Sequence, residues 1–280
     1  MANYTAQDVK KLREETDAPM MECKSALDEA DGDFERAKAL LREKGKAAAS
    51  KRADRTTSAG VVAVAHNHDH TKVGGVVLEC ETDFVARNEG FIEIAQELAE
   101  IFLHNDPSGG PLTIKHGDKT VADIVEGAVA KIRENIKVTN AVQLTTTNRF
   151  STYVHHDRMK AVIVEVIGPD AEIAGNAGRQ VAIQSVAFPP EFIDKSEVPQ
   201  AKIDAELEVE TQRAINEGKD EKIAKNIAMG RINKEYLKKV VLLEQPYYKE
   251  PEKSVAQYLS EEAKGVKIAR LVRLAVGEGA

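Results

Sequence analysis

Two segments of the chain, far apart in the sequence, share one pattern: two short β-rich runs joined by a turn and followed by a helical run. The first pairs GVVAVAH with VGGVVLEC around the turn NHDHTK, and the second pairs FSTYVHH with MKAVIVEVIG. Such runs around turn residues predict β-hairpins. Because VVLE and VIVE occupy the same place in the two segments, we interpret the pattern as an internal duplication of low sequence identity. It favours an α+β fold, in which antiparallel sheets are packed against helices.

The length of 280 residues allows more than one hydrophobic core. Composition shifts and Pro-rich or Gly-rich stretches divide the chain further. We expect three short helices over 1–45, a linker over 46–59 and a first core segment over 60–140. A second core segment follows over 141–198. A helical hairpin over 199–240 interrupts this second segment, which resumes at 241–280.

The N-terminal part carries signals for the start and the end of each helix. Thr5 and Asp8 have the spacing of a capping box, and Asp33 can cap the third helix. Gly45 is expected to end that helix. Met20 begins an apolar repeat at helical spacing, which predicts that it packs inward.

The segment 199–240 predicts two charged helices around the turn NEGKD. Their apolar stripe is narrow, which is typical of a protruding hairpin rather than of a pair of core helices. If the helices are antiparallel, the apolar residues that face one another are Ile203, Leu207, Ala214, Ile223 and Ile227.

Composition argues against several functions. The net charge is −7, only 5% of the residues are aromatic and Trp is absent, so nucleic acid is a poor first guess for the partner. The basic cluster of Lys51, Arg52 and Arg55 could contact RNA, although a solvated tether is the preferred interpretation. Two distant cysteines, a polar N-terminus and the lack of a long apolar run indicate a reduced, cytoplasmic protein without a membrane segment.

The sequence lacks the common motifs for nucleotide binding and for hydrolysis. It has no GxxxxGK[ST], GxGxxG, GxSxG or HExxH, so neither an enzyme nor a cofactor is expected. His66, His68 and His70 alternate around a turn and could bind a transition metal, but a solvated turn is preferred. His155 and His156 form a second histidine pair, which alone indicates no function.

The stretch CETDFVARN, residues 80–88, places Phe84 beside Asp83 between a predicted strand and a predicted helix. Two interpretations stay open. The ring could fold back on the core at the start of the helix. Alternatively, it could point outward from a stiff corner as an anchor for a protein partner, with Asp83 supplying directed charge.

Two stretches resemble signatures of bacterial elongation factor Ts: LREETDAPMMECKSAL at 12–27 and CETDFVAR at 80–87. ENI, YVHH, PPEFI and QPY follow in the order that the family has. The resemblance implies an N-terminal domain similar to ubiquitin-associated domains, a duplicated core and a protruding coiled-coil hairpin. Departures from the family are Pro19, Glu79 and Arg133, where Gly or Ser, Asn and Gly are usual. Some members of the family carry an extra C-terminal helix, which we do not expect in this chain.

The resemblance also implies a function, the exchange of GDP on elongation factor Tu. Thr82, Asp83, Phe84 and Val85 would push into the partner's GTPase domain near its Mg²⁺ ion, with Phe84 as the wedge and Asp83 holding the corner in register. Further contact candidates that the resemblance implies are Leu12, Met20, Met21 and His155. Since Met20 also fits the core by spacing, Met21 is the better contact. An adaptor that tethers a protein or RNA is the alternative, and pairing of the hairpin with a second copy stays open.

Overall fold

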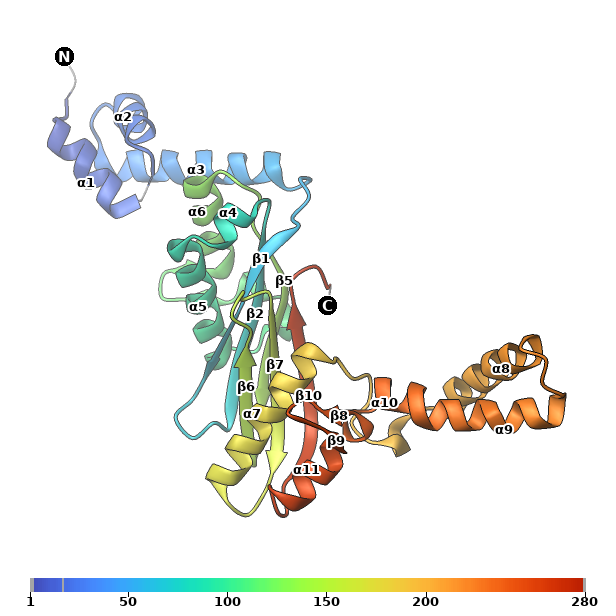
Figure 1. Ribbon diagram of the computed structural model, residues 1–280. Helices are drawn as coiled ribbons and strands as arrows, with labels where there is room; N and C mark the ends of the chain where they lie inside the picture. The colour runs from blue at the N-terminus through green and yellow to red at the C-terminus, as the bar shows by residue number, and fades with distance from the viewer. Residues whose placement is uncertain (1–2, 17, 279–280) are drawn as a thin grey trace. The chain divides into compact units, whose positions relative to one another are not determined.

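The computed structural model of the chain describes residues 3–16 and 18–278, and it confirms the α+β class (Figure 1). The chain divides into two compact units. The first unit consists of the chain up to His66, Val73–Leu144 and the described residues from Leu274 on. The second consists of Asn67–Lys72 and Thr145–Arg273. Across the described ranges, each helix is too short or too polar to cross a membrane.

Three helices open the first unit: α1 (Ala6–Thr16), α2 (Met20–Glu29) and α3 (Phe34–Arg52). Side-chain caps fix where α1 and α3 begin, and Pro19 precedes the first turn of α2. The backbone nitrogen of Thr5 donates to Asp8 Oδ2 at 2.7 Å, and Asp33 accepts from the nitrogen of Arg36 at 2.9 Å. The small core that the three helices share consists of Val9, Leu12, Cys23, Ala26, Leu27, Ala30, Ala37 and Leu41.

The prediction that Gly45 ends the third helix is wrong, because α3 continues to Arg52. Gly45 is buried, and a Cβ atom there would lie 3.4 Å from the Cβ atom of Ala130 in α6 (Val121–Ile132). The glycine therefore allows α3 to approach α6 closely, and contact with α6 supports the helix beyond it. The first part of the expected linker over 46–59 is accordingly helical.

The sheet of the first unit has the strand order β1-β2-β5. Its strands are β1 (Ala59–His66), β2 (Lys72–Cys80) and β5 (Lys137–Thr145). The first two form the expected antiparallel hairpin, and α5 (Glu89–His104) packs against it. Gly74 makes this packing possible, since a Cβ atom there would lie only 2.2 Å from the backbone nitrogen of Leu103. Figure 1 shows α5 and α6 along one side of this sheet.

The second unit repeats the order of hairpin and helix. Its sheet has the order β10-β7-β6, and α7 packs on β6 and β7. The bounds are β6 (Arg149–Val154), β7 (Lys160–Ile167), α7 (Ala171–Ala187) and β10 (Lys267–Ala275). VVLE lies in β2 and VIVE in β7, so the two similar tetrapeptides occupy the second strand of each hairpin.

Short elements complete the two units. In the first they are η1 (Pro107–Gly109), η2 (Pro111–Thr113), β3 (Lys115–His116) and β4 (Lys119–Thr120). In the second they are η3 (Lys195–Glu197), η5 (Leu242–Glu244), β8 (Pro246–Tyr247), β9 (Glu250–Ser254) and α11 (Val255–Glu261).

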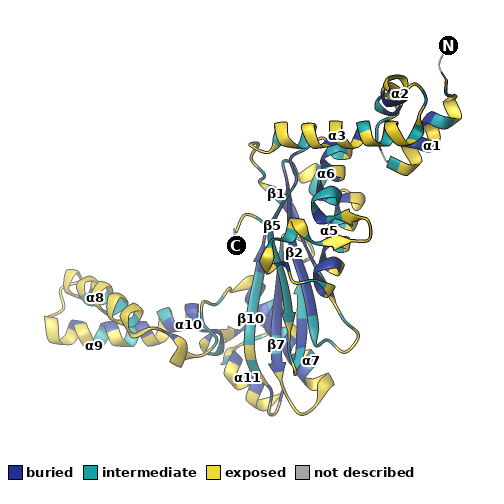
Figure 2. Ribbon diagram, turned by 180° about the vertical axis from the view of Figure 1, so that it is seen from behind, coloured by how far each residue is buried: buried dark blue, intermediate teal, exposed yellow. Residues whose placement is uncertain are grey.

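The second unit also carries the helical hairpin, built from α8 (Gln200–Asn216) and α9 (Glu221–Arg231). A π-helical turn, η4 (Ile232–Tyr236), and α10 (Leu237–Val240) follow it. Figure 2 colours most of α8 and α9 as exposed, in agreement with the narrow apolar stripe.

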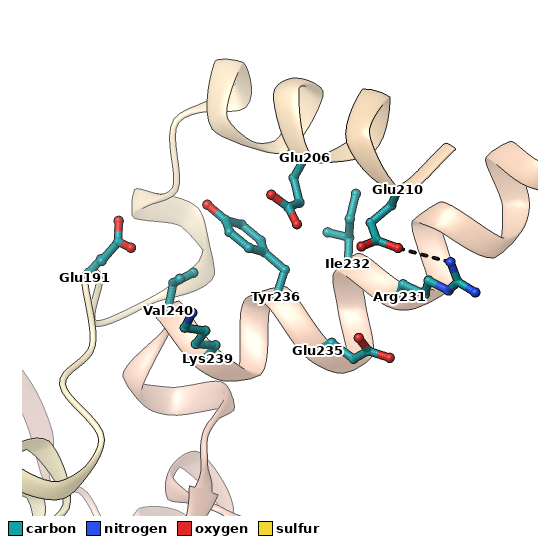
Figure 3. Close-up of a pocket in the computed structure, with 9 residues that line it drawn as sticks. All are labelled: Glu191, Glu206, Glu210, Arg231, Ile232, Glu235, Tyr236, Lys239 and Val240. Carbon is teal, nitrogen blue, oxygen red and sulfur yellow. Dashed lines mark hydrogen bonds and ion pairs between the residues drawn. The ribbon is translucent and has the colours of Figure 1, made fainter. Parts of the chain in front are cut away.

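The contact between α8 and α9 is made by small residues: Ala214, Ala224 and Ala228 are buried. The expected inward position of Ile223 is wrong, because half of its surface is exposed. Near the root of the hairpin, Arg231 Nη1 lies 3.2 Å from Glu210 Oε2, and Figure 3 shows this ion pair linking the two helices.

Asp123 is expected to make the stability of the first unit depend on pH. Its carboxylate accepts hydrogen bonds from Thr120 and pairs with Arg42, and these contacts, those of Thr120 first, lower the pKa of Asp123 to about 2. Because the folded pKa is depressed, the stabilisation is present above the unfolded pKa of about 4 and is lost as the pH falls towards 2. Asp123→Ala should cost about 1 kcal/mol at pH 7. Urea denaturation at several pH values should show that cost shrinking below pH 4, and a constant cost would contradict this assignment.

Candidate functional site

The loop from Cys80 to Asn88 is defined by two helix caps. β2 ends at Cys80, and one turn of helix, α4 (Asp83–Ala86), follows. Thr82 Oγ1 accepts from the backbone nitrogen of Val85 at 3.4 Å, which starts α4. Asn88 Oδ1 accepts from the nitrogen of Gly90 at 3.0 Å and starts α5. The chain therefore turns from strand to helix through a corner with fixed ends.

Glu134, which follows α6, holds this corner through three hydrogen bonds. Its Oε2 accepts from the backbone nitrogens of Glu81 and Thr82, both at 3.0 Å, and its Oε1 accepts from Thr82 Oγ1 at 2.6 Å. In return, Glu81 Oε1 accepts from the backbone nitrogen of Asn135 at 2.6 Å. Hydrogen bonds to ionised carboxylates are stronger than neutral ones, so this reciprocal arrangement gives the corner stiffness.

The inner side of the loop is apolar. Val85 and Ala86 pack against the core cluster of the first unit. The Cys80 thiol is buried and donates to the carbonyl oxygen of Thr82 at 3.2 Å. Burial and then the negative charge of Glu134 raise the pKa of Cys80 to about 12, so the thiol stays protonated at neutral pH. Cys80 is therefore a packing residue rather than a nucleophile.

The outer side of the loop presents Phe84, whose relative exposure is 83%. The interpretation that its ring packs on the core is wrong; the ring that packs in the core cluster at the start of α5 is that of Phe91, which is fully buried. Asp83 pairs with Arg87 at 3.2 Å, and both side chains are exposed. Exposed pairs contribute at most about 1 kcal/mol, so within this chain the corner is held by Thr82 and Glu134. The expected role of Asp83, holding the corner in register by polar contacts, stays a prediction.

The N-terminal candidates differ in accessibility. Leu12 is 0% exposed and belongs to the helical core, so the expectation that it touches a partner is corrected. Met20 is 48% exposed, which overturns its inward placement, and Met21 is 73% exposed. Both methionines lie at the start of α2, because Pro19 precedes the first turn. They form an accessible, flexible apolar surface.

The histidine candidates lie elsewhere. His155 is partly buried in the second unit, where its Nδ1 lies 3.2 Å from the hydroxyl of Tyr153 and its ring stacks edge-on against His156. The metal interpretation of His66, His68 and His70 finds no support. Among residues 3–16 and 18–278, no three His, Cys, Asp or Glu side chains gather in a way that could hold an ion.

Glu134 and Asn135 are the site residues that sequence reasoning missed. They lie in the ENI tripeptide, which the resemblance had marked without giving it a role. Arg133 before them ends α6 in the left-handed conformation, with φ at 65°. The left-handed turn brings Glu134 under the loop, and glycine, which the resemblance led us to expect at position 133, adopts this conformation without strain.

Position 133 gives a testable comparison. Arg133→Gly and Arg133→Ala both remove the exposed ion pair with Glu22, but only the alanine variant keeps a Cβ atom in the left-handed conformation. The glycine variant should be more stable by about 1 kcal/mol. Urea denaturation checks this, and an alanine variant of equal or higher stability would show that the turn is not strained.

A comparison with known families decides what kind of protein carries this loop. A sequence model of the family described as Elongation factor TS matches residues 81–278. The chain belongs to the elongation factor Ts family. The match begins at Glu81 and therefore contains both Phe84 and Glu134.

Curated relatives extend the similarity over the whole chain. Elongation factor Ts of Clostridioides difficile is 39% identical over 288 residues, covering 100% of this chain and 94% of the relative. That of Chloroherpeton thalassium is 39% identical over 291 residues, covering 99% and 100%. That of Aquifex aeolicus is 37% identical over 282 residues, covering 97% of each. Membership in this family makes the chain a translation elongation factor.

Proposed function

We propose that the chain is the guanine nucleotide exchange factor of elongation factor Tu and that the loop at residues 80–88 loosens the bound GDP. The observation that carries the proposal is the exposed Phe84 ring on a corner that Glu134 holds. Large aromatic side chains on stiff, exposed positions are typical anchors of protein interfaces. Membership in the elongation factor Ts family supports elongation factor Tu as the partner.

The proposed mechanism needs no covalent chemistry from this chain. GDP in a GTPase is held by a Mg²⁺ ion that bridges its phosphates and by backbone N–H groups around them. Phe84 enters between side chains near that ion and displaces the elements that hold it. Asp83 and Arg87, which pair with each other at the surface, can face polar groups of the partner beside the ring.

Met20 and Met21 supply a second contact in this proposal. They are exposed and apolar, and they lie in the helical module rather than in the loop. His155 remains a contact candidate in the second unit. It is partly buried and could offer only a small surface.

The energetic requirement is a difference in affinity. A protein that binds the nucleotide-free partner more tightly than the GDP-bound partner must weaken GDP binding by the same factor, because the two equilibria are linked. Isothermal titration of the chain into both forms of elongation factor Tu tests this. We expect much tighter binding to the nucleotide-free form. Equal affinities would exclude an exchange function, however tightly the two proteins bind.

A further inference from the structure

The second unit contains an apolar groove, none of whose lining residues is among those assigned to the proposed exchange function. It has a volume of about 480 Å³ and lies where the end of α7 meets α10 and β8. Most of its lining is aromatic, aliphatic or proline side chains. The lining residues are Gln184, Ala187, Phe188, Pro189, Lys238, Lys239, Gln245, Pro246, Tyr247, Tyr248 and Pro251.

The floor of the groove is preformed. Gln184 Nε2 donates to Gln245 Oε1 at 3.0 Å, and Gln184 Oε1 accepts from the backbone nitrogen of Tyr248 at 2.9 Å. Gln245 Nε2 donates to the carbonyl oxygens of Phe188 and Lys239, both at 3.1 Å. Because these buried amides are satisfied within the protein, a ligand gains little by competing for them. It must bind through the apolar walls and the rim.

The walls expose aromatic surface. Phe188 is 54% exposed at the end of α7, although it is a large apolar residue. Tyr247 is buried behind the walls and is stacked on Tyr258, with ring centroids 4.2 Å apart and planes 14° apart. Tyr248 donates its hydroxyl proton to Gln180 at 2.6 Å, which leaves its ring as a wall. Rigid aromatic walls lose little conformational freedom when a partner side chain enters between them.

The rim is positively charged, although the whole chain has a net charge of −7. Lys238 and Lys239 line the groove, and Lys249 Nζ lies 5.8 Å from the centre of the Tyr248 ring. Among the residues that the structure describes, no ion pair is found for Lys238, Lys239 or Lys249, and the lining of the groove contains no acidic residue. An anionic ligand would therefore meet cations that are not already neutralised.

We propose that this groove binds an acidic, apolar peptide segment of a partner protein. A large aliphatic or aromatic side chain of the segment enters between Phe188 and Tyr248, and flanking Asp or Glu residues reach Lys238 and Lys239. The hollow at the root of the hairpin, shown in Figure 3, shares Lys239 but is lined by Glu191, Glu206, Glu210 and Glu235. Those carboxylates repel such a segment and confine it to the apolar groove.

The chemistry favours a peptide over RNA. The exposed surface of the groove is almost wholly apolar, whereas sites for single strands track the phosphate backbone with many cations. The rim has few lysines and no arginine among the lining residues. The proposal does not depend on the exchange function, because none of the lining residues belongs to the loop at 80–88.

The test uses fluorescence anisotropy with the full-length chain and a fluorescein-labelled peptide of sequence Asp-Glu-Leu-Phe-Asp-Glu. We expect saturable binding of this peptide. A peptide in which Ser replaces both Leu and Phe should bind at least about 10-fold more weakly. Phe188→Ala and the double variant Lys238→Glu/Lys239→Glu should each weaken binding by a similar factor. The matched control, Lys222→Glu/Lys225→Glu on the exposed surface of α9, should leave it unchanged.

Circular dichroism and thermal unfolding of each variant keep the test decisive. Phe188 and both lysines are exposed, so their replacement should leave the fold intact. The proposal is overturned if the peptide shows no saturable binding, or if folded Phe188→Ala binds as the parent chain does. The proposal is also overturned if the groove binds RNA instead of the peptide. In that case labelled oligouridylate would bind, the double variant Lys238→Glu/Lys239→Glu would abolish that binding, and the peptide would not bind.

Discussion

Replacing Phe84 by alanine is expected to slow the release of GDP from elongation factor Tu by about 30-fold, the equivalent of about 2 kcal/mol for a central interface anchor. The reason is that the ring supplies the only large apolar side chain on the outer side of the described loop. Stopped-flow release of a fluorescent GDP analogue measures the effect. The free energy of unfolding should change by less than about 0.5 kcal/mol, because the ring is exposed.

Two control variants separate function from folding in this experiment. Leu112→Ala removes another exposed apolar side chain of the first unit, and we expect it to exchange GDP at the rate of the parent chain. Phe91→Ala removes a fully buried ring seven residues along the chain and should destabilise the fold by about 3–5 kcal/mol. If Phe84→Ala resembled Phe91→Ala in stability, or Leu112→Ala in exchange, the role of the ring would be refuted.

Replacing Glu134 by alanine is expected to have the second largest effect. It removes the acceptor of three hydrogen bonds and leaves the nitrogens of Glu81 and Thr82 without that partner, at a cost of about 1–3 kcal/mol. Exchange should slow by about 10-fold, because the ring at position 84 must then be ordered during binding. Amide hydrogen exchange should become faster in the loop alone. A loss of stability of the whole fold would instead speed it up in other parts of the chain as well.

Glu134→Gln and Asp106→Ala are the matched controls for this result. The glutamine keeps an oxygen for the two backbone nitrogens and should restore most of the exchange rate. Asp106 accepts a hydrogen bond from the nitrogen of Ser108 in another loop of the same unit, so its removal tests the loss of a loop carboxylate in general. Glu134→Ala could exchange GDP at the normal rate even though the amides of its loop exchange hydrogen quickly. That result would show that exchange does not need a stiff corner.

Local signals explain why much of the fold was predictable from sequence. The hairpin around NHDHTK and the caps at Thr5 and Asp33 follow from residue types a few positions apart. Gly45 could not be interpreted correctly, because its helix continues only through contact with Ala130, far along the chain. Ile223 points outward because alanines form the contact between α8 and α9. The spacing of apolar residues does not show which of them make that contact.

The candidate site was predictable in part. Residue types placed Phe84 at a junction between strand and helix, but they left its direction open, since an aromatic side chain fits either a core or an interface. The direction is decided by Phe91, which fills the core, and by Glu134, which is 53 residues from Glu81 in the chain. A hydrogen bond between such distant residues has no local signature, so only the three-dimensional structure reveals it.

The decisive experiment follows the release of fluorescent GDP from elongation factor Tu at increasing concentrations of the unmodified chain. We expect a release rate that rises with concentration and saturates well above the spontaneous rate. A release rate that stays at the spontaneous value up to micromolar concentrations of the chain would contradict it.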